Sequence, residues 1–366
     1  MLRQINRRGL LYKSILASLS LLLFILIACN NKKPKETDGT IDNTATGTGK
    51  DTTFRSDTSI VTVAALLPSA DGKSIEVIFN EKEAVFTLLK EDKSFADFNR
   101  SFESALKSKA PLKIITDPRK GNFSLVAQPS VKEVELYLSF RKDMLPGDSA
   151  MRIDIARIDT ARFNIVDEYL KWPVFKLCTK VVPNYATAKQ IFDYCAAQSC
   201  HIVGPHQVTP CIPFQYVIDG CYARAHKMRW IIEQHFGYCS EKVFSFANQG
   251  NHKLAVQANK WGGCCVEWWF HVTPVIRVKR TFGKITRTMA YVIDPGMFNE
   301  PVLLSTWLAA QENLACNANG HVDFYSIQPS SAYLPTYPTG APFTTDPNYI
   351  QTNNTLTGYA GGHTCN

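Results

Sequence analysis

The placement of the cysteines constrains this chain more than any other feature. The sequence has 366 residues and 11 cysteines, and all of them except Cys29 lie between residues 178 and 365. Cysteines at such a density are typical of a domain held together by disulfides, provided that the domain lies in an oxidising compartment. The distribution therefore predicts two parts: a first half without structural cysteines, and a second half that disulfides stabilise.

The N-terminus indicates that the chain is exported. Basic residues precede the apolar run 14–28, which is too short to span a bilayer comfortably, and Ala28-Cys29 closes this run. A small residue directly before a cysteine resembles the bacterial lipobox. We therefore expect residues 1–28 to be a lipoprotein signal peptide and Cys29 to be lipidated, which anchors the chain to the bacterial outer membrane or cell surface. The alternatives are an ordinary signal peptide and an N-terminal anchor helix, and either one also takes the rest of the chain out of the cytoplasm.

Residues 29–58 are polar and contain almost nothing apolar, which predicts a disordered tether. The net charge of +8 is spread along the chain, with no basic helix face. We therefore expect no nucleic-acid partner.

Residues 59–172 are predicted to form a small α+β domain. The runs 60–67, 74–79 and 84–89 have the composition of strands, and Phe95, Phe98, Phe102 and Leu106 have the spacing of an amphipathic helix. The segments 112–116, 123–128 and 132–140 are interpreted as extended or ambiguous.

The second domain is predicted to span residues 173–366. Pro173 and Pro183 bracket a connector that a protease could cleave. The further elements that we expect are a helix over 185–198, a strand over 211–220 that runs into an Asp-Gly turn, a helix over 221–237, two paired strands over 264–280 and 287–295, and a tail of ordered loops from Asn317 that Cys365 staples.

Cys221 lies at the expected start of a helix. The free backbone N–H groups and the positive end of the helix dipole favour a thiolate there and lower the thiol pKa. A nucleophilic thiol also needs a base and an acceptor that orients the base. His271, in an otherwise apolar strand, and Asp294, at the end of the paired strand, are the candidates. The alternatives are that Cys221 is half of a disulfide and that His271 is a core residue.

The remaining histidines and cysteines are less suited to catalysis. His226 lies five residues after Cys221 and therefore on another side of the helix, so we expect a structural role for it. Cys264 and Cys265 are adjacent and lack the spacing of a metal site, so we expect neither a metal nor a cofactor. Trp268 and Trp269 alternate along the strand of His271. One of them is a candidate to line the substrate cleft, and the alternative is that both belong to the core.

The residues around these candidates resemble a known family. The segments VIDGCYARAHKMR (217–229), CCVEWWFHV (264–272) and YVIDP (291–295) are similar to the secreted bacterial protein-glutaminases, which deamidate glutamine side chains in intact proteins. The similarity also takes in residues 181–192 and 198–200, and it covers the chain from about residue 178.

The resemblance implies an α+β fold similar to transglutaminase and papain-like cysteine hydrolases, in which the helix that carries the cysteine packs on an antiparallel sheet. It implies a triad of Cys221, His271 and Asp294 that forms a thioester and hydrolyses it. Members of this family are proenzymes, so residues 59–172 would inhibit the site until an activating protease removes them.

Several points stay open at this stage. The same triad could serve a cysteine peptidase or a transglutaminase, and a non-catalytic surface lipoprotein with only structural cysteines is a further alternative. We expect a monomer whose partners are proteins with exposed glutamines. With Cys221 free, nine cysteines remain in the second half, and a Cys200–Cys211 disulfide is the one pairing that we predict.

Overall fold

The computed structural model describes residues 57–69, 71–116, 122–141, 180–202, 208–362 and 365. The chain divides into Met1–Thr53 and Phe54–Asn366, and every described residue belongs to the second unit. The predicted signal peptide, the lipidation at Cys29, nearly all of the tether and most of the connector therefore lie outside the described residues. None of the described helices is long and apolar enough to cross a membrane.

The N-terminal part combines two small antiparallel sheets with two helices. One sheet has the strand order β2-β3-β4 and the other β1-β5-β6. The side chains of Phe79, Phe86 and Phe102 pack in its core. The elements are β1 (Asp57–Val61), β2 (Val63–Pro68), β3 (Ser74–Phe79), β4 (Val85–Leu89), α2 (Phe95–Ser108), β5 (Leu112–Thr116), β6 (Phe123–Ala127) and α3 (Val131–Arg141).

Helix α3 corrects the interpretation of 132–140 as extended or ambiguous. Ser130 and Glu133 form a capping box: the Ser130 hydroxyl accepts from the Glu133 backbone N–H at 3.3 Å, and the Glu133 carboxylate accepts from the Ser130 N–H at 2.8 Å. These reciprocal bonds satisfy backbone donors at the first turn and start a helix, although the segment has little amphipathic periodicity.

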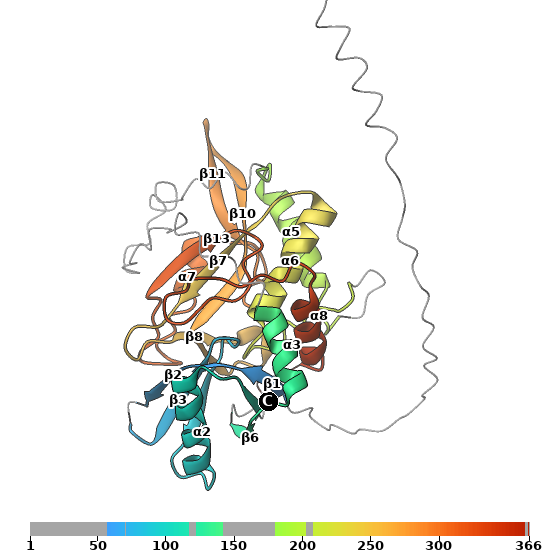
Figure 1. The fold of residues 1–366 in the computed structure, drawn as a ribbon. Helices are drawn as coiled ribbons and strands as arrows, with labels where there is room; N and C mark the ends of the chain where they lie inside the picture. Colours follow the sequence, from blue (N-terminus) through green and yellow to red (C-terminus); the bar gives the residue numbers. More distant parts are fainter. Residues whose placement is uncertain are drawn as a thin grey trace, which may run out of the picture. The chain divides into compact units, whose positions relative to one another are not determined.

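The C-terminal part is built around a five-stranded antiparallel sheet in the order β12-β11-β10-β7-β13. Helix α6 contacts the long strand β10, and α5 and α8 lie beside α6 (Figure 1). The elements are α5 (Tyr185–Ala197), α6 (Cys221–Phe236), β7 (Glu241–Phe246), β8 (Leu254–Gln257), η3 (Asn259–Trp261), β9 (Cys265–Trp268), β10 (Phe270–Phe282), β11 (Ile285–Val292), β12 (Val302–Leu303), α7 (Leu304–Ala309), β13 (Phe324–Gln328) and α8 (Ile350–Tyr359). This α+β arrangement is the predicted one.

The residues before α6 differ from the expectation. Residues 211–220 contain turns and one isolated bridge between Ser199 and Ile212 in place of the predicted strand. Gly220 then adopts a left-handed conformation with φ of 91°, and a Cβ at this position would lie 2.8 Å from the ring of Tyr359. Glycine is therefore needed to turn the chain into the helix so that Cys221 is its first residue.

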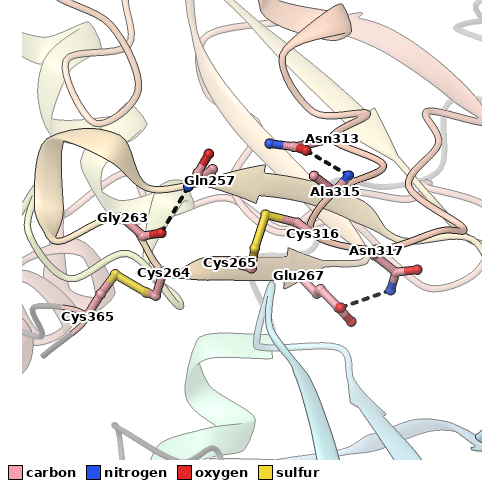
Figure 2. The surroundings of a disulfide bond; sticks show 10 residues. All are labelled: Gln257, Gly263, Cys264, Cys265, Glu267, Asn313, Ala315, Cys316, Asn317 and Cys365. Carbon is pink, nitrogen blue, oxygen red and sulfur yellow. Dashed lines mark hydrogen bonds between the residues drawn. A yellow bond between two sulfur atoms is a disulfide. The ribbon is translucent and has the colours of Figure 1, made fainter.

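Disulfides hold the C-terminal part together. The predicted Cys200–Cys211 bond is present, and two further bonds join Cys264 to Cys365 and Cys265 to Cys316 (Figure 2). As predicted, a disulfide at Cys365 fixes the tail from Asn317, and its partner is Cys264. It is wrong, however, to describe the tail as loops only, because β13 pairs with β7 and α8 packs on α6.

Candidate active site

Cys221 lies buried at the first turn of α6. Its side chain is 1% exposed, and it is one of two free cysteines among the described residues, the other being Cys195. The Cys221 backbone N–H donates to the Glu83 carboxylate Oε2 at 2.6 Å. The helix start therefore holds a carboxylate of the N-terminal part directly beside the thiol.

The strands bring His271 and Asp294 to this thiol. His271 lies on β10, and its Nε2 donates to Asp294 Oδ2 at 2.9 Å, so the other ring nitrogen, Nδ1, is left for the thiol. One ring nitrogen of His271, the Cys221 sulfur and a carboxylate oxygen of Glu83 all lie within 4.8 Å of one another. The three residues that the sequence singled out therefore meet at one buried place.

Asp294 is held as a carboxylate by its surroundings. Burial acts to raise its pKa, but the hydrogen bond and charge of His271 and the Trp307 indole, which donates to Oδ2 at 2.9 Å, lower it overall. An ionised acceptor with two fixed donors orients the imidazole and stabilises its protonated form.

The two candidate tryptophans face different surroundings. Trp268 stacks on the His271 ring with a centroid distance of 4.6 Å, and both line a cavity of about 200 Å³ that also reaches Asp294. Trp269 is fully buried in the core, and its indole N–H donates to the Lys82 carbonyl at 2.6 Å. Trp268 thus contacts the candidate base, whereas Trp269 contacts the segment that contains Lys82 and Glu83.

Three other histidines among the described residues have partners outside the group of Cys221, His271 and Asp294. His226 is buried, with Nε2 near the Asp346 carbonyl and Nδ1 near the Lys242 amine, and burial lowers its pKa. His252 and His321, together with Asp323, form a second group of metal-ligand types. Both oxygens of the Asp323 carboxylate already have partners in the protein: Oδ1 bonds His252, and Oδ2 accepts from two backbone N–H groups.

Comparison with known proteins found similar chains. A family model described as glutaminase matches residues 188–311. A crystal structure of pro-protein-glutaminase superposes with a TM-score of 0.58 at 25% identity, covering 85% of this chain and 95% of that one. A crystal structure of protein-glutaminase, and the NMR structure of the enzyme from Chryseobacterium proteolyticum, are each 33% identical, with TM-scores of 0.44 and 0.43, and each covers 50% of this chain and 91% of its own. No curated protein matches.

The chain belongs to the protein-glutaminase family. It is a glutamine-deamidating hydrolase in proenzyme form, and its fold is the papain-like α+β fold that the sequence predicted. The match to the proenzyme covers 85% of the chain and therefore includes residues before 180. We call the described N-terminal part, residues 57–141, the pro-region.

The pro-region changes the chemistry of the thiol. Burial, followed by the neighbouring Glu83 carboxylate, raises the pKa of Cys221 well above its usual value. This corrects the expectation of a lowered pKa, which considered the helix dipole alone. In the protein-glutaminase proenzyme the desolvation cost of a thiolate and the repulsion from Glu83 outweigh the dipole, so the thiol stays protonated.

Three residues around the site were missed by the sequence-based reasoning. Glu83 lies in the pro-region and gives no signal as a functional residue. Asp219, which accepts from the Glu83 N–H at 2.9 Å, lies within the family-like segment around Cys221 but was considered only as part of a turn. Trp307 follows Asp294 by 13 residues, and no motif connects the two.

The buried Glu83 predicts how the pH affects the docked pro-region. Burial raises its pKa from 4.5 to about 7, even though the charges of Arg224 and His271 oppose this shift. Since the docked state binds the proton more tightly, the stability from Glu83 is fully present below pH 4.5 and is lost as the pH rises through 7. The loss amounts to at most about 3 kcal/mol.

This prediction is tested by denaturant unfolding between pH 4.5 and 8. The free energy of unfolding of the native chain, minus that of Glu83→Ala, is expected to fall as the pH rises. The difference between the two proteins removes the contributions of all other titrating groups. A difference that is constant or grows with pH would show that Glu83 is docked as a carboxylate.

Proposed function

We propose that Cys221, His271 and Asp294 form the catalytic triad of this protein-glutaminase, with Cys221 as nucleophile, His271 as general base and acid, and Asp294 as the group that orients His271. The observation that carries this proposal is the position of Glu83. Glutamate is the product of glutamine deamidation, and the pro-region presents a glutamate side chain to the thiol and imidazole.

In this proposal, one carboxyl oxygen of Glu83 corresponds to the amide oxygen of a substrate glutamine and the other to its amide nitrogen. Oε2 accepts from the Cys221 N–H, as the oxygen of a tetrahedral intermediate would in an oxyanion hole. Oε1 takes the position of the leaving nitrogen. Oε1 and His271 Nδ1 are both buried without a hydrogen-bond partner among the described residues, and Oε1 also lies 3.6 Å from the Arg224 guanidinium. His271 Nδ1 is therefore left to transfer a proton to a leaving group. The raised pKa keeps Glu83 neutral below about pH 7, and in that form it resembles an uncharged amide.

The reaction follows from these positions. The Cys221 thiol gives its proton to His271 Nδ1, and the sulfur attacks the side-chain carbonyl carbon of a substrate glutamine. The oxyanion binds the Cys221 N–H. The C–N bond breaks as His271 protonates the nitrogen, so that ammonia leaves and a thioester remains. Water then gives a proton to His271 and attacks the thioester, which releases glutamate and restores the thiol. The cavity beside His271 and Trp268 has room for this water.

Inhibition by the pro-region follows from the same contacts. Glu83 occupies the position of the reacting side chain. Its carboxylate accepts from the Cys221 N–H, and its own backbone N–H donates to Asp219 Oδ1. We infer that the pro-region competes with substrate until the connector before Val182 is cleaved. A tethered competitor acts at an effective concentration in the millimolar range, so cleavage is needed for full activity.

Ammonia release from a glutamine-rich protein, before and after limited proteolysis of the full-length chain, tests the proposed function. Cleavage is expected to raise the rate at least about tenfold. Mass spectrometry should show amide-to-carboxyl replacement at glutamines with the substrate backbone intact. Cut substrate without ammonia release would indicate a peptidase, and cross-linked substrate would indicate a transglutaminase. Either result would contradict the proposal.

A further inference from the structure

Lys82, the residue directly before Glu83, fills a pocket of the catalytic part. Its amine lies 3.1 Å from Asp219 Oδ2 and donates to the Tyr359 hydroxyl at 2.6 Å. The same hydroxyl donates to Asp219 Oδ2 at 2.5 Å. The lysine is only 4% exposed and Asp219 only 1%, so this ion pair is buried.

The backbone around Lys82 is bound by one isolated antiparallel bridge and by hydrogen bonds from Trp269. The Trp269 indole donates to the Lys82 carbonyl, and the Trp269 backbone N–H donates to the Glu83 carbonyl at 3.0 Å. Ala84 pairs with Trp268 as an antiparallel bridge. Main-chain bonds of this kind fix the register of a bound chain without regard to its sequence. A substrate bound in the same register places its target glutamine where Glu83 lies and the preceding residue where Lys82 lies.

We propose that Asp219 and Tyr359 form a subsite for a cationic side chain, so that the enzyme prefers glutamines that directly follow lysine or arginine. This inference rests on the proposed function, in which Glu83 occupies the position of the reacting glutamine. A cavity of about 270 Å³ borders Lys82 and Tyr359, and residues of both the pro-region and the catalytic part line it. Without the pro-region, the space beside Tyr359 has room for the longer arginine side chain.

The chemistry of Asp219 explains the preference. Its Oδ1 accepts the backbone N–H at the reacting position, so Asp219 must stay in place for any substrate, and its Oδ2 then needs a cation. Arg224 donates to the backbone carbonyls of Tyr216 and Asp219, and its other terminal nitrogen lies 3.6 Å from Glu83 Oε1, so this guanidinium is engaged by groups other than Oδ2. If the residue before the glutamine is apolar, the buried Asp219 carboxylate keeps only the Tyr359 hydroxyl as a partner for Oδ2. If that residue is acidic, its carboxylate also repels Asp219.

The test measures kcat/KM for ammonia release by the full-length chain after limited proteolysis. The substrates are capped pentapeptides that differ only in the residue before a single glutamine: lysine, norleucine or glutamate. Norleucine keeps the unbranched chain and lacks the amine. Lysine is expected to exceed norleucine at least about tenfold, and glutamate is expected to be slowest.

Two variants separate the subsite from the reaction. Asp219→Asn keeps an oxygen for the backbone N–H and removes the charge, and Tyr359→Phe keeps the ring and removes the hydroxyl. Each should reduce the lysine preference to about threefold or less while glutamines are still hydrolysed. The matched control is Asp193→Asn, which removes an exposed carboxylate that pairs with Lys189 on α5 and should keep the preference.

The outcomes distinguish this inference from the proposed function. Equal kcat/KM for lysine and norleucine peptides in the native sequence would overturn the subsite and leave the deamidase intact. A lysine preference that persists in both variants would also overturn it. Failure to hydrolyse any peptide or a glutamine-rich protein would overturn the proposed function, and the subsite with it.

Discussion

Replacing Cys221 with alanine is expected to lower kcat/KM for deamidation by about 10⁴-fold or more in the cleaved enzyme. The thiol lies within 4.8 Å of both a ring nitrogen of His271 and the Glu83 carboxylate, and a thiol can form a covalent acyl intermediate. Loss of the nucleophile from a triad removes the covalent route and leaves only binding and the oxyanion donor. The measurement is ammonia release at several substrate concentrations.

The matched control is Cys195→Ala, because Cys195 is the other free cysteine among the described residues and is equally buried. It lies in the hydrophobic core on α5, and burial raises the pKa of its thiol. This variant should keep its kcat and lose some stability, about 1 kcal/mol. If both variants lost activity to the same extent, general damage to the fold would explain the result and Cys221 would have no special role.

The positions of Cys221, His271 and Asp294 were predictable because each is determined by local structure. A glycine turn that starts a helix, and two strands joined by the tight turn at Gly283, leave little freedom in where these side chains lie. Their meeting depended on the pairing of β10 with β11 and on the packing of α6 against β10. The family resemblance supplied that long-range information, which periodicity alone does not contain.

Two local predictions failed for identifiable physical reasons. For α3, the capping box at Ser130 was a readable signal that a search for apolar periodicity overlooked. For residues 211–220, apolar composition was taken as strand propensity, although Ile212 and Phe214 are buried by packing against α5 and α6. Burial of a short apolar run does not require a strand.

The role of Glu83 could not be predicted from the sequence. It lies 138 residues before Cys221, on the segment between β3 and β4, and no motif marks it. Only the three-dimensional arrangement shows that this glutamate lies beside Cys221 and His271. The pKa of the Cys221 thiol depends on the same contact, so its direction could not be predicted from the sequence either.

The same contact predicts that Glu83→Gln turns the pro-region into a substrate. Glutamine has the shape of the neutral acid, and its oxygen can accept from the Cys221 N–H as Oε2 does. The amide nitrogen would then lie at the position of Oε1, near His271. We expect the full-length variant to deamidate its own residue 83 without added substrate, because binding is intramolecular. The double variant Glu83→Gln, Cys221→Ala is the control, and it should keep glutamine at this position.

Peptide mass spectrometry of residue 83 in these two full-length variants tests whether Glu83 lies where a substrate glutamine reacts. In the single variant we expect glutamate at position 83, or a thioester between residue 83 and Cys221 with loss of ammonia. In the double variant we expect unchanged glutamine. Glutamine that persists at position 83 in both variants, while the cleaved enzyme deamidates other proteins, would contradict the assignment of the Glu83 position as the reacting site.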